Sequence, residues 1–156
     1  MSKFLLLPLV VMLAWLWNLA VVDVRYATRA EWEAQDGGWL PSILPGSVRD
    51  IHTVNNLDLD TSQGEFEFSD TDAGDFFARL SLDVPAKAPF ADWQGILEDY
   101  RGSGHVAWSY REGAATWVFF CDPTEDSCDY LRWTSSDRGR SRLASAQQRH
   151  AGHRPE

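Results

Sequence analysis

Positive charge is scarce in this sequence, which has 14 Lys and Arg residues against 23 Asp and Glu and a formal net charge of −9. The imbalance is uneven, because residues 137–156 contain five Arg and two acidic residues and carry +3, so residues 1–136 carry −12. Binding to nucleic acid without sequence preference depends on Lys and Arg that neutralise phosphates. The acidic body therefore argues against DNA or RNA as a partner, and only residues 137–156 have the charge to attract them.

Cysteine is also rare, and the two that occur are Cys121 and Cys128. No second Cys or His pair stands at ligand spacing beside them, which argues against a zinc site. They lie on either side of six residues between two predicted strands, a spacing typical of a disulfide across a hairpin. Because such bonds persist in oxidising compartments, we predict a Cys121–Cys128 disulfide and a domain outside the cytoplasm. Two unpaired, half-buried thiols are the alternative.

Sequence motifs for catalysis are missing. The chain has no G-x-S-x-G, G-x-x-x-x-G-K, G-x-G-x-x-G or H-E-x-x-H motif. His52 and His105 each lie beside a predicted strand and are candidate bases only if a carboxylate meets them in space. Asp58, Asp60 and Ser62 alternate like the start of an EF-hand loop, but the glycine comes one place late and the closing Glu is absent. We therefore predict no catalytic residue, no cofactor and no metal site.

One long apolar run is present, from Phe4 to Val22, and Lys3 precedes it. As a helix it would span roughly 28 Å at 1.5 Å per residue, which nearly matches the hydrocarbon core of a bilayer. We predict a single-pass transmembrane anchor over residues 1–25. A cleaved signal peptide is the alternative, although small-x-small cleavage sites are poor here, and a buried core helix is a third interpretation.

Composition divides the remaining chain into three parts. Residues 26–46 contain a Gly pair and two Pro, so we expect an extended collar that leads from the membrane to the domain. Residues 47–136 carry the strand and helix patterns. Residues 137–156 lack apolar periodicity and are predicted to be a disordered basic tail. Arg25 and Arg29 directly follow the apolar run and leave an inverted orientation, with the domain in the cytoplasm, as an alternative.

Hydrophobic periodicity within residues 47–136 predicts the element order ββααβββ. Strands are expected over Ser47–Leu59, Glu65–Ser69, Val106–Tyr110, Thr116–Cys121 and Cys128–Ser135, with a turn at Asp60–Gly64 and helices starting near Ser69 and Phe90. Runs of strands followed by runs of helices are typical of α+β domains. We expect two layers, an antiparallel sheet of about five strands with two helices on one face.

The sequence favours a membrane-tethered envelope protein that acts as a non-catalytic binding or scaffolding module. This interpretation depends on the predicted membrane anchor, the predicted disulfide and the absence of catalytic motifs. Its expected partners are the membrane and an envelope protein. Trp39, Trp108 and Trp133 are candidate partner-binding residues because Trp is enriched at binding hot spots, with core packing as the alternative for each. The alternative function is a small-ligand binder or hydrolase with a pocket between sheet and helices, where His52 or His105 would act.

Residues 40–52 have the sequence LPSILPGSVRDIH, and Phe66 and Phe68 follow. This stretch resembles the start of small uncharacterised bacterial membrane-anchored proteins with an L-P-x-S-A-x-D-I-H-type motif, over about residues 40–80. Val48 stands where those chains often carry Ala. The resemblance implies an envelope location and no activity. Together with the apolar run and the predicted disulfide, it gives the expectation of a single-pass protein of the bacterial inner membrane whose domain faces the periplasm or cell exterior.

Overall fold

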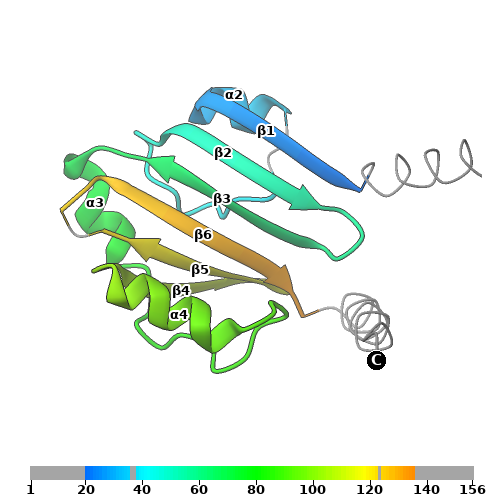
Figure 1. Cartoon of the computed structure of the whole chain (residues 1–156). Coiled ribbons are helices and arrows are strands. Elements are labelled where there is room, and N and C mark those ends of the chain that lie inside the picture. The colour runs from blue at the N-terminus through cyan, green and yellow to red at the C-terminus, as the bar shows by residue number, and fades with distance from the viewer. Residues whose placement is uncertain (1–19, 36–37, 123, 136–156) are drawn as a thin grey trace, which may run out of the picture.

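The computed structural model describes residues 20–35, 38–122 and 124–135 (Figure 1). Its elements are β1 (Val21–Thr28), α2 (Arg29–Gln35), β2 (Arg49–Asn56), β3 (Thr61–Glu67), α3 (Asp70–Phe77), α4 (Trp93–Gly102), β4 (Val106–Glu112), β5 (Ala115–Cys121) and β6 (Ser127–Thr134). The strands form one antiparallel sheet in the order β1-β2-β3-β6-β5-β4. The predicted α+β class and antiparallel sheet are confirmed, with six strands instead of about five.

The extra strand and an extra helix come from the N-terminal region. The sequence predicts the end of the anchor here and then an extended collar over 26–46. The collar is wrong for residues 26–35, which form the end of β1 and helix α2, whereas residues 38–46 lie in no helix or strand. Val22, Val24 and Tyr26 alternate with charged residues, which is typical of a strand with one buried face, and Val24 and Tyr26 pack on the core. Trp32 in α2 is buried in the same core.

The predicted membrane anchor lies mostly outside the described residues, because it covers 1–19 before it reaches the sheet. Its last five residues, Val21 to Arg25, belong to β1, so for these residues the prediction is wrong. Within the described ranges, no helix has the length and apolar character needed to span a membrane. The predicted basic tail, residues 137–156, also lies outside the described part of the chain.

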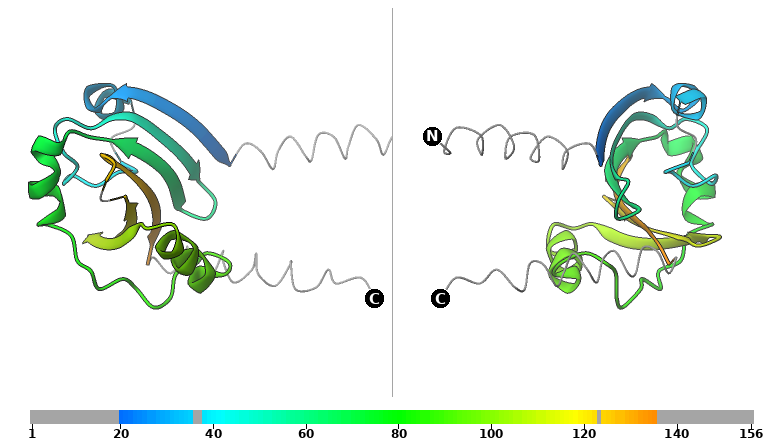
Figure 2. Two further views of the ribbon diagram at one scale, coloured as in Figure 1. Left: turned by 60° about the vertical axis from the view of Figure 1, so that its left-hand side comes forward. Right: turned by 90° about the vertical axis from the view of Figure 1, so that its right-hand side faces the viewer.

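Helices cover both faces of the sheet, so the prediction of two helices on one face is wrong. In β5, Trp117, Phe119 and Cys121 face one side, where α2 and α3 pack, and this is named the α3 face. Val118 and Phe120 face the other side, where α4 packs, and this is named the α4 face. The right-hand view of Figure 2 shows α2 and α3 on one side of the sheet and α4 on the other.

The β2–β3 hairpin is confirmed, but its turn lies at residues 57–60 and not at 60–64. Gly64 lies inside β3, where an added Cβ would be 1.9 Å from the backbone carbonyl oxygen of His52. The glycine therefore permits a close approach between two strands where their register is irregular, and it does not serve a turn.

The chain enters and leaves the sheet at the same end. Val21 pairs with Asn56, Asn56 pairs with Thr61, and Thr61 pairs with Trp133, so the start of β1 and the end of β6 lie side by side along the strand direction. We call this the proximal end. The opposite, distal end carries the loop between β5 and β6 and helix α3 (Figure 1).

Candidate functional site

The predicted disulfide is confirmed. Cys121 at the end of β5 and Cys128 in β6 are register partners, their Cα atoms are 4.2 Å apart and their sulfurs are bonded. Both residues are 2% exposed, so the bond lies inside the α3-face core rather than on the surface. It closes the loop at the distal end.

The three candidate Trp residues do not form one surface. Trp39 lies under the guanidinium of Arg132, whose carbon is 4.6 Å from the ring centroid, and Trp108 packs on Phe77 at 5.4 Å. Both lie on the α3 face. Trp133 is only 8% exposed and packs in the α4-face core. Packing within the domain accounts for the position of each ring.

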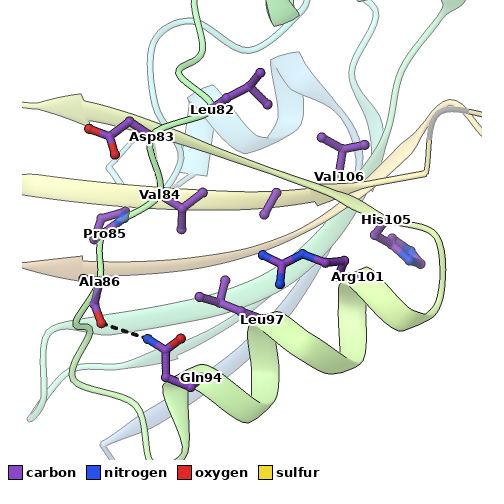
Figure 3. A pocket seen from close by; sticks show the side chains of 11 residues that line it. Leu82, Asp83, Val84, Pro85, Ala86, Gln94, Leu97, Arg101, His105 and Val106 are labelled. Atoms are coloured by element: carbon purple, nitrogen blue, oxygen red, sulfur yellow. Dashed lines mark hydrogen bonds between the residues drawn. The ribbon is translucent and has the colours of Figure 1, made fainter.

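A cleft of about 590 Å³ runs between the segment 82–86, helix α4 and the start of β4 (Figure 3). We call it the α4 cleft. Polar and apolar atoms contribute about equally to its surface, and its lining residues are Leu82, Asp83, Val84, Pro85, Ala86, Gln94, Leu97, Arg101, His105, Val106 and Ala107. The volume falls in the range of sites for small organic ligands.

Hydrogen bonds hold the walls of the cleft in place. Ser81 and Ser109 exchange two backbone bonds with N···O distances of 2.9 and 2.7 Å, which join the segment before the cleft to the outer edge of β4. The indole N–H of Trp93 donates to the carbonyl oxygen of Pro85 at 2.8 Å, which joins the same segment to α4. These bonds fix the segment 82–86 against both β4 and α4.

Arg101 supplies a positive charge inside this cleft. Gln94, Leu97 and Arg101 share one face of α4 because they are spaced by three and four residues. Figure 3 shows the guanidinium of Arg101 extending over the cleft and the carboxylate of Asp83 pointing away from it. Among the described residues Arg101 has no ion-pair partner. The arrangement suits an anionic group attached to an apolar body.

His105 lies at the same end of the cleft as Arg101 (Figure 3). Its ring packs edge-on against Tyr100, with centroids 5.3 Å apart, and its buried Nδ1 has no hydrogen-bond partner in the described part of the chain. Among the described residues no carboxylate lies within ion-pair distance of its ring, although the Asp122 carboxylate interacts with it electrostatically. His105 therefore lacks the partner that a catalytic base would need.

His52 does meet carboxylates. On the α4 face of the first three strands, its Nε2 is 2.8 Å from Asp23 Oδ1 and its Nδ1 is 3.6 Å from Glu65 Oε1. Arg25 Nη1 is 3.7 Å from the same Glu65 oxygen. These side chains border a hollow of about 400 Å³, which we call the His52 hollow. Its lining contains no Ser, Thr or Cys, and its side-chain hydroxyls are the phenols of Tyr100 and Tyr130.

Tyr100 and Asp129 close the side of the His52 hollow next to α4. The Tyr100 hydroxyl donates to Asp129 Oδ2 at 2.8 Å, and its ring stacks on Phe120 with centroids 3.9 Å apart. Burial and then the hydrogen bond to the Asp129 carboxylate raise the pKa of Tyr100 above its ordinary value. Tyr100 is therefore a hydrogen-bond donor at neutral pH and not a base.

The EF-hand-like residues are engaged otherwise. Asp60 accepts hydrogen bonds from Arg132 Nη1 at 2.9 Å and from the Thr134 hydroxyl at 2.6 Å. The Ser62 hydroxyl is buried and donates to Asn55 Oδ1 at 2.6 Å. Across the described residues, no group of three His, Cys, Asp or Glu side chains is placed to hold a metal ion. The hairpin turn accounts for these acidic residues.

Sequence reasoning missed two features of these sites. The contact of His52 with Asp23 depends on β1, and the signal for β1 was the alternation of valines and charged residues after the apolar run. The position of Arg101 in a cleft depends on the segment 82–86, whose path no periodicity predicts. His150 and His153 lie outside the described residues.

Residues 21–67 match the family described as the YbbD head domain. The match begins at the first residue of β1 and ends at the last residue of β3, so it covers the β1–α2–β2–β3 unit and under a third of the chain. No curated protein and no solved structure matches the chain. This chain is therefore similar to the YbbD head domain over the unit that carries His52, while the α4 cleft lies beyond the matched residues.

Proposed function

We propose that this chain is a membrane-tethered protein of the bacterial envelope whose domain faces the periplasm or cell exterior and acts as a non-catalytic binding module. Its binding site is the α4 cleft. Its ligand carries a carboxylate or similar anionic group on a short apolar body, either as a small molecule or as part of an envelope protein.

Two observations support the location. The buried Cys121–Cys128 disulfide is of the kind that persists in oxidising compartments. The sequence from Phe4 to Ala20 is apolar apart from Asn18 and leads directly into β1.

The observation that carries the binding site is the position of Arg101. The guanidinium of Arg101 has no acidic partner within the described ranges, although acidic residues outnumber basic ones in the protein. Apolar side chains, Leu97 and Val84 among them, line the cleft beside it. A charge-assisted hydrogen bond from the exposed Arg101 guanidinium to an anionic ligand would be stronger than one between neutral groups.

Nuclear magnetic resonance of the full chain in lipid nanodiscs tests the site with hexanoate, hexanol and hexylamine as probes. Hexanoate should shift the amide signals of Leu97, Arg101 and Ala107, and hexylamine should not. Arg101→Gln should remove the response, whereas Arg111→Gln, an exposed position near the proximal end of β4, should keep it. Equal shifts with hexanoate and hexylamine, or shifts confined to other residues, would contradict this site.

Location is tested with a thiol introduced on the surface, because Cys121 and Cys128 are too buried to react in the folded domain. Ala78→Cys, exposed just after α3, should react with a membrane-impermeant maleimide in intact spheroplasts. The labelled chain should remain in the membrane fraction after carbonate extraction. Labelling only after lysis would place the domain in the cytoplasm.

The His52 hollow favours a second candidate, a hydrolase. His52, oriented by Asp23, would take a proton from water there, since no Ser, Thr or Cys side chain lines the hollow. Hydrolysis of nitrophenyl acetate and nitrophenyl phosphate by the native chain, lost in His52→Gln, would support it. Equal rates for native and variant chains would reject it.

A further inference from the structure

The surface at the proximal end of the domain differs from the rest of the molecule in its exposed apolar residues. Five large hydrophobic side chains are exposed among the described residues, and three of them are here: Val21 at 41%, Val22 at 37% and Leu57 at 49%. The other two, Leu82 and Val106, line the α4 cleft. Val21 and Val22 are consecutive in β1 and point to opposite sides of the sheet, so what they share with Leu57 is their place at this end of the strands.

No spacer separates this surface from the apolar N-terminal sequence. Val21 is the first residue of β1, and the carbonyl oxygen of Ala20 accepts a hydrogen bond from the backbone N–H of Leu57 at 2.8 Å. The apolar run that remains, Phe4 to Ala20, would span roughly 25 Å as a helix, which is still long enough for an anchor. A bilayer that holds Ala20 at its surface therefore also meets Leu57.

The chain leaves the domain at the same place. The backbone N–H of Ser135 donates to the carbonyl oxygen of Ala114 at 2.9 Å, at the proximal end of β5 and β6. The five Arg of residues 137–156 follow it in the sequence. Lys and Arg next to a membrane are attracted to anionic lipid headgroups. In the sequence, basic residues therefore follow the point where an otherwise acidic chain leaves this end of the sheet.

Acidic groups at this end limit how deep it can lie. Asp60 is turned inward, because Arg132 and Thr134 bond its carboxylate, but Asp58 is exposed at the tip of the turn next to Leu57. Glu112 at the end of β4 bonds Ser42. These groups suit the headgroup layer and not the hydrocarbon core.

We propose that the proximal end of the domain, formed by Ala20–Val22, the turn 57–60 and Ser135, rests directly on the bilayer surface, with Leu57 in the interfacial layer. This inference depends on the membrane tether of the proposed function. Because β4 begins at the distal end, the part of the α4 cleft near Val106 then faces away from the membrane. The contact would therefore fix both the orientation of the α4 cleft relative to the membrane and its distance from the bilayer surface.

The test uses single thiols in the full chain, reconstituted in vesicles of phosphatidylcholine with one-fifth phosphatidylglycerol. The native cysteines are joined and buried, so a fluorophore attaches only to an introduced Cys. Leu57→Cys reports the proximal end, and Asp58→Cys gives a second measurement there with Leu57 intact. Ala78→Cys is the matched control, an exposed position just after α3. Flotation of the vesicles tests the tether, and quenching by lipids with a headgroup nitroxide tests the contact.

We expect the chain to float with the vesicles and the fluorescence at positions 57 and 58 to be strongly quenched. The fluorescence at position 78 should equal that in vesicles without nitroxide. Flotation with equal quenching at all three positions, or with none at 57 and 58, would overturn the contact while the tether stands. Failure to float would overturn the tether itself and the contact with it.

Discussion

Reduction of the Cys121–Cys128 disulfide should destabilise the domain by an amount that the length of its loop determines. The two residues are separated by 7 positions in the sequence. A cross-link restricts the unfolded chain, and the chain-entropy relation for a loop of this length gives about 2.4 kcal/mol at 25 °C. That corresponds to a change of roughly 60-fold in the ratio of folded to unfolded molecules.

The folded state should contribute little to this difference. Both cysteines are 2% exposed in the α3-face core, and reduction keeps both sulfur atoms in place, so it leaves no methyl-sized cavity. Replacement by Cys121→Ala/Cys128→Ala removes the sulfurs as well. We therefore expect the double variant to be less stable than the reduced native chain.

Urea unfolding of the full chain in mild detergent, followed by tryptophan fluorescence, measures both effects. The unfolding midpoint of the native chain should fall on addition of a reductant, and that of the double variant should not respond to it. An unchanged midpoint in the native chain would refute the loop-entropy reasoning, and so would a reduced chain less stable than the double variant.

Three further predictions concern single positions. Gly64→Ala should lower the free energy of unfolding by more than about 2 kcal/mol, and with it the urea midpoint, because its Cβ would meet the His52 carbonyl, and an unchanged midpoint would contradict the close approach. Gly74→Ala should instead raise stability by up to about 1 kcal/mol, since the site is exposed in α3 and nothing lies within 4 Å of the new Cβ; a loss of stability would contradict this. Asp60→Asn should cost about 1 kcal/mol at pH 7, because Arg132 and Thr134 bond an ionised carboxylate that is partly exposed. Burial opposes ionisation of Asp60, but these partners outweigh it and hold its pKa below the ordinary value. The stability that Asp60 contributes is present above the unfolded pKa of about 3.9 and is lost as the pH falls through the lower folded value. The difference in urea midpoint between the native chain and the variant should therefore close between pH 4 and strongly acidic conditions. A difference that stays constant with pH would exclude this role.

The C-terminal half of the domain was predictable because its strands alternate strongly. The strands that became β4, β5 and β6 were located to within two residues, and the disulfide followed from the positions of Cys121 and Cys128 at facing strand ends. Helices α3 and α4 were also found, from an apolar stripe after a polar start. In these segments local propensity and tertiary packing favour the same structure.

The N-terminal half of the domain was not predictable in the same way, because strand β1 begins inside the long apolar run and was assigned to the membrane anchor. Val21 and Val22 continue the hydrophobic stretch that starts at Phe4. The length of this stretch favoured a membrane helix, and the predicted helix extended into the residues that form β1. As an edge strand, β1 is buried at Tyr26 alone, and its pattern is weak for that reason. Gly64 was misplaced in a turn because a close approach between strands leaves no signal in the sequence.

For the candidate sites too, the sequence identified single residues but not the remote residues that the fold brings to them. The sequence analysis named His52 and His105 as candidates but could not supply their partners, since Asp23 is remote from His52 in the sequence and joins it only through β1–β2 pairing. The cleft around Arg101 requires the segment 82–86 to be held against β4 and α4 by hydrogen bonds between remote residues.

By itself the sequence determined the α+β class, the antiparallel meander, the disulfide and the uneven charge, because each depends on residue type and on spacing along a few neighbouring residues. Only the tertiary structure decided which face each helix covers, because an apolar stripe shows that a helix packs but not on which side of a sheet. The tertiary structure also decided that the chain joins the sheet at Val21 without a collar, because strand pairing with residues far along the chain selects β structure there over the continued apolar run.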